Sequence, residues 1–386
     1  MKKLIISSVR FLMILLILFF ITKGWFGVNM PLLKKDTTSQ KILNQRLQLP
    51  EGFSLSLFAD KLLGARMLLL TETGDLLVSL SKHGKIILLH KDANADGVAD
   101  ASRELISDLN LPHGMSFYQD WLYIAETDAV GRVRFDAKKG KTVGEYQRII
   151  TGLPEGGNHW SRSLHFGPDG MLYVSVGSSC NVCQEKDPRR AALLRFTPEG
   201  KQAEIFASGL RNTVGFDWHL TTHKLYGVDN GRDFLGDDFP PCELNHIEQD
   251  GFYGWPYVNG QQIPDPDFGD KAQLETSIAP VHVFAAHTAP LSLIFIKNAE
   301  LRAAIKADAL VALHGSWNSS KKVGYKVVSL QFDAENDIIE SDFITGFEVN
   351  GNVIGRPVDI VEAPDGSLYI SDDFTGSIYK VSYAAR

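Results

Sequence analysis

Histidine, arginine and amide side chains recur at similar points along this chain, most of them a short distance before an apolar strand. The set comprises Arg66, His113, His159 with Arg162, Arg211 with Asn212, His287 with Thr288, and Arg356. An imidazole titrates near neutral pH and can act as a general base, whereas a guanidinium pairs bidentately with carboxylates. If the fold brings these side chains together, they can take a proton from a substrate and hold an anionic ligand.

The segments that must position these side chains form a unit that recurs about six times. Each unit contains a turn and an apolar strand that often ends in Leu-Tyr, at 74–78, 120–124, 168–173, 224–226, 309–311 and 364–369. A spacing of about 45–60 residues built from short strands is typical of a β-propeller, in which each blade is one four-stranded sheet. The sequence therefore predicts an all-β, six-bladed β-propeller over residues 49–386, whose innermost strands carry the polar residues to one mouth.

The two ends of this region are expected to close the ring. Residues 53–59 could form a strand beside residues 377–383, so that an N-terminal strand completes the last blade and leaves no free sheet edge. Residues 298–306 could form one short helix.

The charge of the chain argues against nucleic acid as a partner. The 386 residues carry a net charge of −7, with an isoelectric point near 5.9, and binding to a phosphate backbone needs a concentrated basic surface. A small-molecule partner fits better.

The N-terminus predicts export. Residues 1–30 have the features of a signal or membrane-anchor segment, in which Lys2 and Lys3 precede a largely apolar stretch over residues 4–28, and residues 31–48 are expected to be a linker. The stretch approaches the length that spans a bilayer, no Ala-x-Ala-like cleavage site follows it, and the two lysines would stay in the cytoplasm. We expect a periplasmic or otherwise exported protein, anchored to the inner membrane by residues 4–28 unless they are removed.

Cys180 and Cys183 form a Cys-x-x-Cys pair in a loop after the third Leu-Tyr strand. In an exported protein this spacing favours a local disulfide over a redox-active pair, because the βαβ context of thioredoxin-like motifs is missing. A second pair for zinc and a His after Cys183 for haem attachment are also missing. Cys242 is expected to be a buried or loop thiol.

An oxygen-rich segment, residues 229–245, lies where the repeat lengthens between its fourth and fifth copies. Its Asp, Glu, Asn and Gly residues offer the hard oxygen ligands and the flexible backbone that calcium requires. A solvated acidic loop is the alternative. The aromatic residues that follow, Phe252, Tyr253 and Trp255, favour a site because they could form the wall for a flat ligand.

A second, weaker calcium candidate contains Asp92, Asn94, Asp96 and Asp100. It begins like a calcium-binding loop, but its twelfth position is Arg103, where a bidentate Glu would be expected. The alternative is a polar hairpin turn within the first blade.

The histidines and arginines also have structural explanations. A single His such as His113 or His159 is more often structural than catalytic, and an Arg can form a salt bridge between blades. The place of His159 in the repeat, which matches those of Arg211 and Arg356, favours a functional role for it.

Seven ordered motifs between about Leu49 and Tyr383 resemble the pyrroloquinoline-quinone (PQQ)-dependent glucose and sorbosone dehydrogenases, which are six-bladed propellers of the periplasm. The motifs are Leu-Pro-His-Gly at 111–114, Asn-His-Trp-Ser-Arg at 158–162, Phe-Gly-Pro-Asp-Gly at 166–170, Gly-Leu-Arg-Asn at 209–212, Glu-Leu-Asn at 243–245, Tyr-Gly-Trp-Pro at 253–256 and Gly-Arg-Pro at 355–357. The segments around Cys180 and at 314–318 are more similar to the sorbosone dehydrogenase branch.

The resemblance implies a role for most members of the set. His159 matches the catalytic base, and Arg211 with Asn212 matches residues at the quinone, Arg211 lying near the reacting carbonyl. Arg356 matches a partner of a cofactor carboxylate, and His113 and Thr288 match further polar contacts to the cofactor. The backbone carbonyls of Gly231 and Arg232 match those that hold the catalytic calcium ion.

Two positions depart from the pattern of the glucose enzyme. Asn158 stands where that enzyme has an Asp before the catalytic His, and His314 and Ser316 stand where its fifth blade supplies a Lys to the quinone, with Lys321 and Lys322 further on. These departures bear on activity with glucose and on cofactor affinity.

The leading interpretation is PQQ- and calcium-dependent oxidation of an aldose or aldehyde-type sugar, sorbosone-like, by base-assisted hydride transfer to the quinone. One alternative is a calcium-dependent lactonase-type propeller, in which an axial metal polarises a carbonyl and which would need carboxylates from several blades. Another is a non-catalytic binding propeller. The sequence leaves open the sugar, the electron acceptor (a quinone or a cytochrome) and the oligomeric state.

Overall fold

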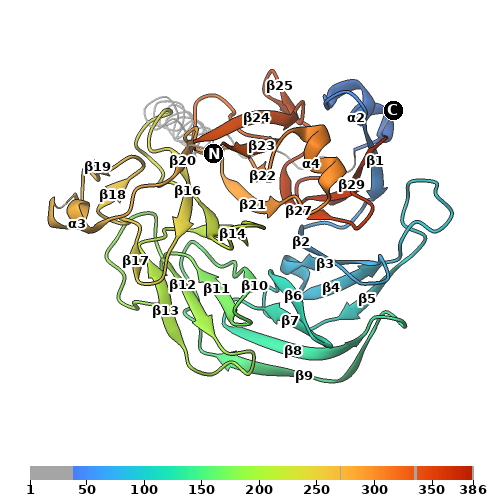
Figure 1. Cartoon of the computed structure of the whole chain (residues 1–386), viewed down its shortest axis with the longest axis horizontal. Helices are drawn as coiled ribbons and strands as arrows, with labels where there is room; N and C mark the ends of the chain where they lie inside the picture. Colours follow the sequence, from blue (N-terminus) through green and yellow to red (C-terminus); the bar gives the residue numbers. More distant parts are fainter. Residues whose placement is uncertain (1–37, 270, 334–336, 385–386) are drawn as a thin grey trace, which may run out of the picture.

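A computed structural model of the chain describes residues 38–269, 271–333 and 337–384. The expected signal or anchor at 1–30, and residues 31–37 of the expected linker, lie outside the described residues. Six sheets of four or five strands are arranged in a ring, with one strand of each next to the central axis (Figure 1). The predicted all-β, six-bladed propeller is confirmed.

The blades follow the chain in order, and each runs from an inner strand outward. Blade 1 is β2 Ala65–Leu70, β3 Leu76–Leu80, β4 Lys85–Leu89 and β5 Ser102–Ile106; blade 2 is β6 Met115–Tyr118, β7 Trp121–Ala125, β8 Ala129–Asp136 and β9 Lys141–Thr151; blade 3 is β10 Leu164–Phe166, β11 Leu172–Val176, β12 Ala192–Phe196 and β13 Glu204–Ser208, with β17 Gly251–Phe252 added in parallel. Blade 4 is β14 Thr213–Trp218, β15 Leu225–Asp229, β16 Cys242–Ile247 and β20 His282–Phe284; blade 5 is β21 Pro290–Phe295, β22 Ala309–Leu313, β23 Lys326–Phe332 and β24 Ile338–Ile344; blade 6 is β27 Pro357–Glu362, β28 Leu368–Asp372, β29 Ser377–Tyr383 and β1 Phe53–Ala59.

The smaller elements lie in the connections. They are two hairpins, β18 Val258–Asn259 with β19 Ile263–Pro264 and β25 Glu348–Val349 with β26 Asn352–Val353, the 3-10 turn η1 Ser81–His83, and the helices α2 Gln40–Arg46, α3 Lys271–Thr276 and α4 Ala299–Ile305. Helix α4 confirms the short helix predicted at 298–306: the Asn298 side chain caps it by accepting from the Leu301 N–H at 2.9 Å.

Strand β1 closes the ring by pairing antiparallel with β29, from Phe53 opposite Tyr383 to Ala59 opposite Ile378. The predicted clasp is therefore confirmed. The Gln40 amide of α2 then covers part of the outer edge of β1, because it accepts from the Leu57 N–H at 2.7 Å and donates to the Leu55 carbonyl at 2.8 Å. Leu43 of the same helix is buried against blades 5 and 6. The described part of the expected linker is thus packed on the ring.

The inner strands of blades 1, 4, 5 and 6 each carry a β-bulge near their first residue, where the strand has one residue more than its partner. A bulge changes the direction of the side chains beside it. Arg66, Val214 and Leu291 lie in three of these bulges, and all three line a cavity at the axis. The bulges thus determine which inner-strand side chains face this cavity.

Asp359 joins three blades at the axis. Its carboxylate accepts from the Leu68 N–H of blade 1 at 2.8 Å and from the Ser292 hydroxyl of blade 5 at 2.7 Å. Burial raises the pKa of Asp359 to about 6, although these donors oppose the rise.

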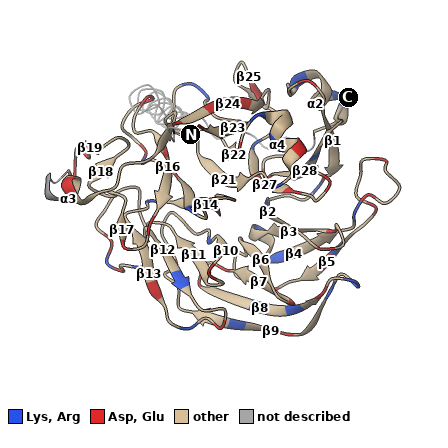
Figure 2. Ribbon diagram, in the orientation of Figure 1, with Lys and Arg blue, Asp and Glu red and all other residues tan. Residues whose placement is uncertain are grey.

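Lysine and arginine are interspersed with aspartate and glutamate around the ring (Figure 2). Among the described residues, none of the helices has the length and apolar character needed to cross a membrane.

We expect Asp359→Asn to become more favourable relative to wild type as the pH rises. The amide can still accept from Leu68 and can donate to Ser292, but it carries no charge. The pKa of Asp359 is about 6 in the folded chain and ordinarily 3.8. Ionisation of this carboxyl therefore lowers the free energy of unfolding of the wild type as the pH rises from 4 to 7, by up to about 3 kcal/mol. Urea unfolding of both proteins across this range measures the difference. Parallel curves would contradict the expectation.

Candidate active site

A cavity of about 290 Å³, here called the axial cavity, opens where the inner strands begin. Five blades contribute to its lining, with Arg66, His159, Asn212, Leu291 and Asp373 from blades 1, 3, 4, 5 and 6. A second cavity, of about 770 Å³, is lined by later residues of the same strands, and it therefore lies at the other end of the axis. The recurring polar residues predicted to meet at one mouth do so only in part.

His159 is placed to accept a proton. Its Nδ1 lies 2.9 Å from the carbonyl oxygen of Ser178, which can only accept, so Nδ1 carries the hydrogen and Nε2 keeps its lone pair. Burial, and next the positive charge of Arg211, lower the pKa of His159 to about 3. The imidazole is therefore neutral at physiological pH, as a base must be before it reacts.

Arg211 lies behind the lining, and Asn212 lies in it. The Arg211 guanidinium donates to the Asn181 carbonyl from Nε at 2.9 Å, to the Asn181 side-chain oxygen at 2.9 Å and to the Asn230 carbonyl at 3.0 Å. The nearest carboxylate, that of Asp233, is 3.6 Å away. Uncharged oxygens thus fix most of the group, and much of its positive charge remains available to an anion.

Other arginines near the site are held in the same way. Arg162 donates to the carbonyls of His159 at 3.0 Å and Ser161 at 2.8 Å, and Arg190 donates to the carbonyl of Gly156 at 2.8 Å. A salt bridge between blades was the structural alternative for the arginines. Arg66 forms one, because it pairs with Asp373 of blade 6.

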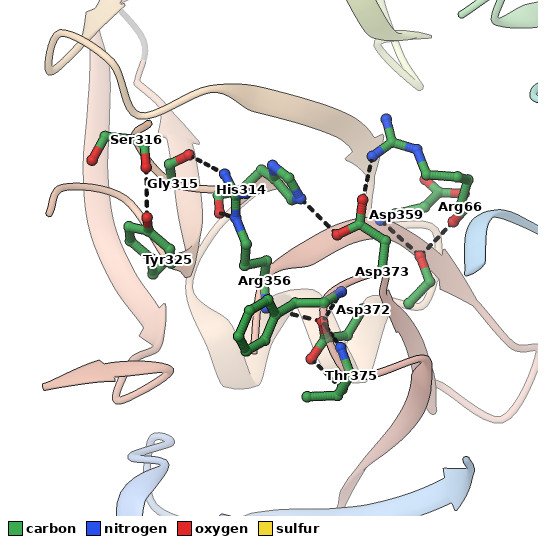
Figure 3. A network of polar contacts seen from close by, with 12 residues as sticks. Arg66, His314, Gly315, Ser316, Tyr325, Arg356, Asp359, Asp372, Asp373 and Thr375 are labelled. Carbon is green, nitrogen blue, oxygen red and sulfur yellow. Dashed lines mark hydrogen bonds and ion pairs between the residues drawn. The ribbon is translucent and has the colours of Figure 1, made fainter. Parts of the chain in front are cut away.

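Arg356 and His314 belong to a network beside the cavity (Figure 3). The Arg356 guanidinium donates to the carbonyls of His314 at 3.1 Å and Gly315 at 2.5 Å, and it lies over the Tyr325 ring. The His314 imidazole points instead to Asp373, at 2.8 Å. Arg356 therefore flanks the cavity wall without lining it.

Asp373 is a lining residue that the sequence did not single out. It lies between Arg66 at 2.9 Å and His314 at 2.8 Å. Burial acts to raise its pKa, but His314 and Arg66 outweigh burial and hold the pKa of Asp373 far below its ordinary range. The signal available was its place directly after a Leu-Tyr strand that ends in Asp372.

His113 and Thr288 are buried behind the lining. The Nε2 atom of His113 is 3.5 Å from Arg66, and its ring meets Trp160 edge-on. The Thr288 hydroxyl donates to the Ala285 carbonyl at 2.8 Å. His113 thus contacts two residues of the lining, whereas Thr288 contacts Ala285, which is not part of it.

The loop after β15 contains Gly231 and Arg232, the predicted calcium ligands. The Arg232 side chain is buried and pairs with Asp265 at 2.7 Å and with Asp267 at 2.9 Å. Around Gly231 other backbone oxygens crowd in: a Cβ there would lie 2.6 Å from the Pro241 carbonyl and 3.1 Å from that of Pro240. The lack of a side chain at Gly231 thus lets the backbone of residues 240–241 pack against this loop. Backbone carbonyls are among the oxygen ligands that calcium takes.

The weaker calcium candidate forms the hairpin turn between β4 and β5, away from the axial cavity. The Asp92 carboxylate accepts from the N–H groups of Asp96 and Gly97 at 2.9 Å each, and Asn94 accepts from Asp96 at 2.9 Å. Asp100 accepts from the Ala93 N–H at 3.2 Å. The backbone of the turn thus uses these oxygens as acceptors.

Cys180 and Cys183 form the expected disulfide, and Cys242 is a buried thiol. The aromatic residues expected to wall a flat ligand do not line the cavity: Tyr253 and Trp255 are buried. Phe234 and Trp317 form an exposed edge-on pair, with ring centroids 5.8 Å apart, on the loops that follow β15 and β22. Sequence patterns do not reveal this pair, because the two loops are distant along the chain.

A family model described as TrAA12-like matches residues 47–250 and 257–384. A protein of Borreliella burgdorferi described as uncharacterized is 30% identical over 376 residues, which cover 91% of this chain and 95% of that protein. The pyrroloquinoline quinone-dependent pyranose dehydrogenase of Coprinopsis cinerea is 23% identical over 86% of this chain, which spans about half of that enzyme's length (54%).

Two solved structures share the fold. The holo form of the PQQ domain of the Coprinopsis cinerea pyranose dehydrogenase has a TM-score of 0.74 at 22% identity, covering 87% of this chain and 97% of that chain. The calcium structure of a Trichoderma reesei family AA12 enzyme has a TM-score of 0.76 at 20% identity, covering 91% and 99%.

Gly177→Ala should displace His159. An added methyl carbon would lie 2.6 Å from the side-chain oxygen of Asn212 and 2.6 Å from Cβ of His159, so one of them must move. We expect a loss of about 1–3 kcal/mol in the free energy of unfolding and a shifted NMR signal for the Nδ1–H of His159.

The matched control is Gly351→Ala, at a glycine with φ of +81° and nothing within 4 Å of the added carbon. It should cost some stability and leave the His159 signal in place. An unchanged His159 signal in Gly177→Ala would contradict the close packing described here.

Proposed function

The chain belongs to the TrAA12-like family, and we propose that it is a dehydrogenase that uses PQQ and calcium to oxidise a sugar. The resemblance to the PQQ-dependent sugar dehydrogenases is thereby confirmed at the level of the family. The observation that carries the proposal is His159, a neutral imidazole whose Nε2 is left as an acceptor in an axial cavity.

The residues present fit an anionic quinone. The cavity lies near the lower end of the size range of small-ligand sites, and Arg66 and Lys82 line it while Arg211 stands behind Asn212. Carbonyl oxygens hold much of the arginine charge in place without neutralising it. Such a site favours carboxylates and carbonyl oxygens that gain negative charge.

Each residue then has a task. His159 takes the proton of the sugar hydroxyl at Nε2, while the Ser178 carbonyl keeps the Nδ1–H and the ring in place. Arg211 and Asn212 orient the cofactor and stabilise negative charge that develops beside them. The bound quinone supplies the oxidant that accepts the hydride. The carbonyls of Gly231 and Arg232 would hold the calcium ion.

We propose an aldose or aldehyde-type sugar, sorbosone-like, as the substrate class. The uncharged Asn158 next to the base and the engagement of His314 by Asp373 separate this site from the glucose pattern. Asp373 is the carboxylate among the described lining residues, and it is already paired with Arg66 and His314. This arrangement does not favour the lactonase alternative, which needs several metal-binding carboxylates.

We also propose that the chain is exported, with residues 4–28 as an anchor in the inner membrane, and that a membrane quinone or a cytochrome takes its electrons. The Cys180–Cys183 disulfide supports an oxidising compartment. Fractionation of cells that express the full chain tests the location.

His159→Asn should abolish most activity and spare cofactor binding. The amide can still donate to the Ser178 carbonyl, but it offers no basic nitrogen, so we expect kcat to fall about a hundred- to ten-thousand-fold. Dye reduction with a panel of sugars, calcium and PQQ measures kcat, and an absorbance titration measures quinone binding.

The matched control is His223→Asn, an exposed histidine in the turn between β14 and β15, which should behave as wild type. The proposal fails if the wild-type chain with calcium binds no quinone, and the role of His159 fails if His159→Asn keeps wild-type kcat.

A further inference from the structure

The loop of residues 178–185, which the Cys180–Cys183 disulfide closes and which we call the disulfide loop, contacts both the base and Arg211. At its start, the Ser178 carbonyl holds Nδ1 of His159 at 2.9 Å, and the Ser178 hydroxyl donates to the Cys180 carbonyl at 2.7 Å. At its end, Glu185 accepts from the N–H of Ser179 at 2.5 Å and from its hydroxyl at 2.8 Å. The disulfide and Glu185 thus fix the loop internally.

Asn181, between the two cysteines, connects this loop with two other segments. Its backbone carbonyl accepts from Nε of Arg211, and its side-chain oxygen accepts from the same guanidinium at 2.9 Å and from the Asp233 N–H at 2.8 Å. Its side-chain nitrogen donates to the Asp233 carbonyl at 3.0 Å. Asp233 directly follows Gly231 and Arg232.

Only a primary amide makes this set of contacts from one short side chain. The oxygen needs two lone pairs for Arg211 and Asp233, and the nitrogen needs a hydrogen for the Asp233 carbonyl. An aspartate would lack the donor, and an alanine would leave several buried or half-buried polar groups of its neighbours without these partners. The identity of residue 181 is therefore tied to the positions of both neighbours.

We propose that Asn181 is a positioning residue that sets Arg211 and the Gly231–Arg232 segment in one fixed relation, with the disulfide loop as its rigid support. The inference rests on the proposed function for what those two segments bind. It adds that one loop, through Ser178 and Asn181, fixes the positions of the proposed base, the proposed cofactor arginine and the proposed calcium-binding carbonyls relative to one another.

The first test needs neither quinone nor calcium. Asn181→Ala removes one of the three hydrogen bonds of the Arg211 guanidinium, the one to the side-chain oxygen, and keeps those to the backbone carbonyls of residues 181 and 230. The guanidinium should therefore shift from its place near His159. The charged groups that lower the pKa of His159 are Arg211, Arg190 and Arg162, with Arg211 the largest contributor after burial. We therefore expect the imidazole signals of the variant to begin titrating by NMR at a higher pH than those of wild type.

The second test measures binding. Asn181→Ala should weaken PQQ binding at least about tenfold by absorbance titration, and should raise the calcium concentration needed for half-maximal binding. A double variant, Cys180→Ala with Cys183→Ala, removes only the support and should move both quantities in the same direction by a smaller factor. Asn350→Ala, at an exposed turn residue between β25 and β26, is the control and should match wild type in both binding quantities. It should cost some stability, because φ of Asn350 is +51°, in the left-handed region that Asn tolerates better than Ala.

Three results separate the possibilities. A shifted His159 titration together with weaker PQQ binding supports the inference. A lower unfolding midpoint with an unshifted titration and unchanged PQQ binding overturns it, since Asn181 would then be merely structural. If wild type binds no PQQ, the proposed function fails, and the NMR titration alone decides whether Asn181 positions Arg211.

Discussion

The crowding of six inner strands around one axis is the constraint on which the site depends. The backbone N–H and C=O groups of each inner strand must find hydrogen-bond partners without a paired strand on the axial side. The chain provides them with bulges and small polar side chains. Ser79, Ser175 and Ser371 lie at matching places in the second strands of blades 1, 3 and 6. Their hydroxyls accept from N–H groups in the inner strand or, in blade 3, directly before it. Since the same bulges direct Arg66, Val214 and Leu291 into the cavity, the solution of a backbone problem also shapes the site.

The second general feature is that carbonyl oxygens hold most of the arginines near the site. A carboxylate would fix a guanidinium equally well, but it would also cancel the charge. Carbonyls fix Arg211, Arg162 and Arg356, so carboxylates offset their charges only in part, as at Arg211, where the Asp233 carboxylate is 3.6 Å away. Arg66 is the contrasting case, because Asp373 neutralises it and His314 shares the same carboxylate. The arginines of the site thus fall into two kinds, with Arg66 paired to a carboxylate and the others held mainly by carbonyls.

The sequence predicted the ring and its closure because these depend on local patterns. Turn residues and Leu-Tyr strands mark each blade, and the alternation at 53–59 suffices for the clasp. The depth of each side chain was not predictable in the same way. Arg356 and His113 match His159 in the repeat, yet they lie behind the lining, because bulges and loop paths differ from blade to blade. Asn181 and Asp373 escaped notice because their partners lie at least 30 residues away along the chain.

The uncharged Asn158 also has a consequence for the base. No carboxylate stands directly before His159. Burial and the charges of nearby arginines therefore lower the pKa of its imidazole to about 3. Such an imidazole is a weak base, and general-base catalysis works best when the pKa lies nearer the working pH. An anion bound against Arg211 opposes the charge that lowers the pKa and so raises it towards that range. Under the proposed function, the electrostatic field that attracts an anionic cofactor is also the one that the bound cofactor would offset to strengthen His159 as a base, so binding and activation would be two effects of one interaction.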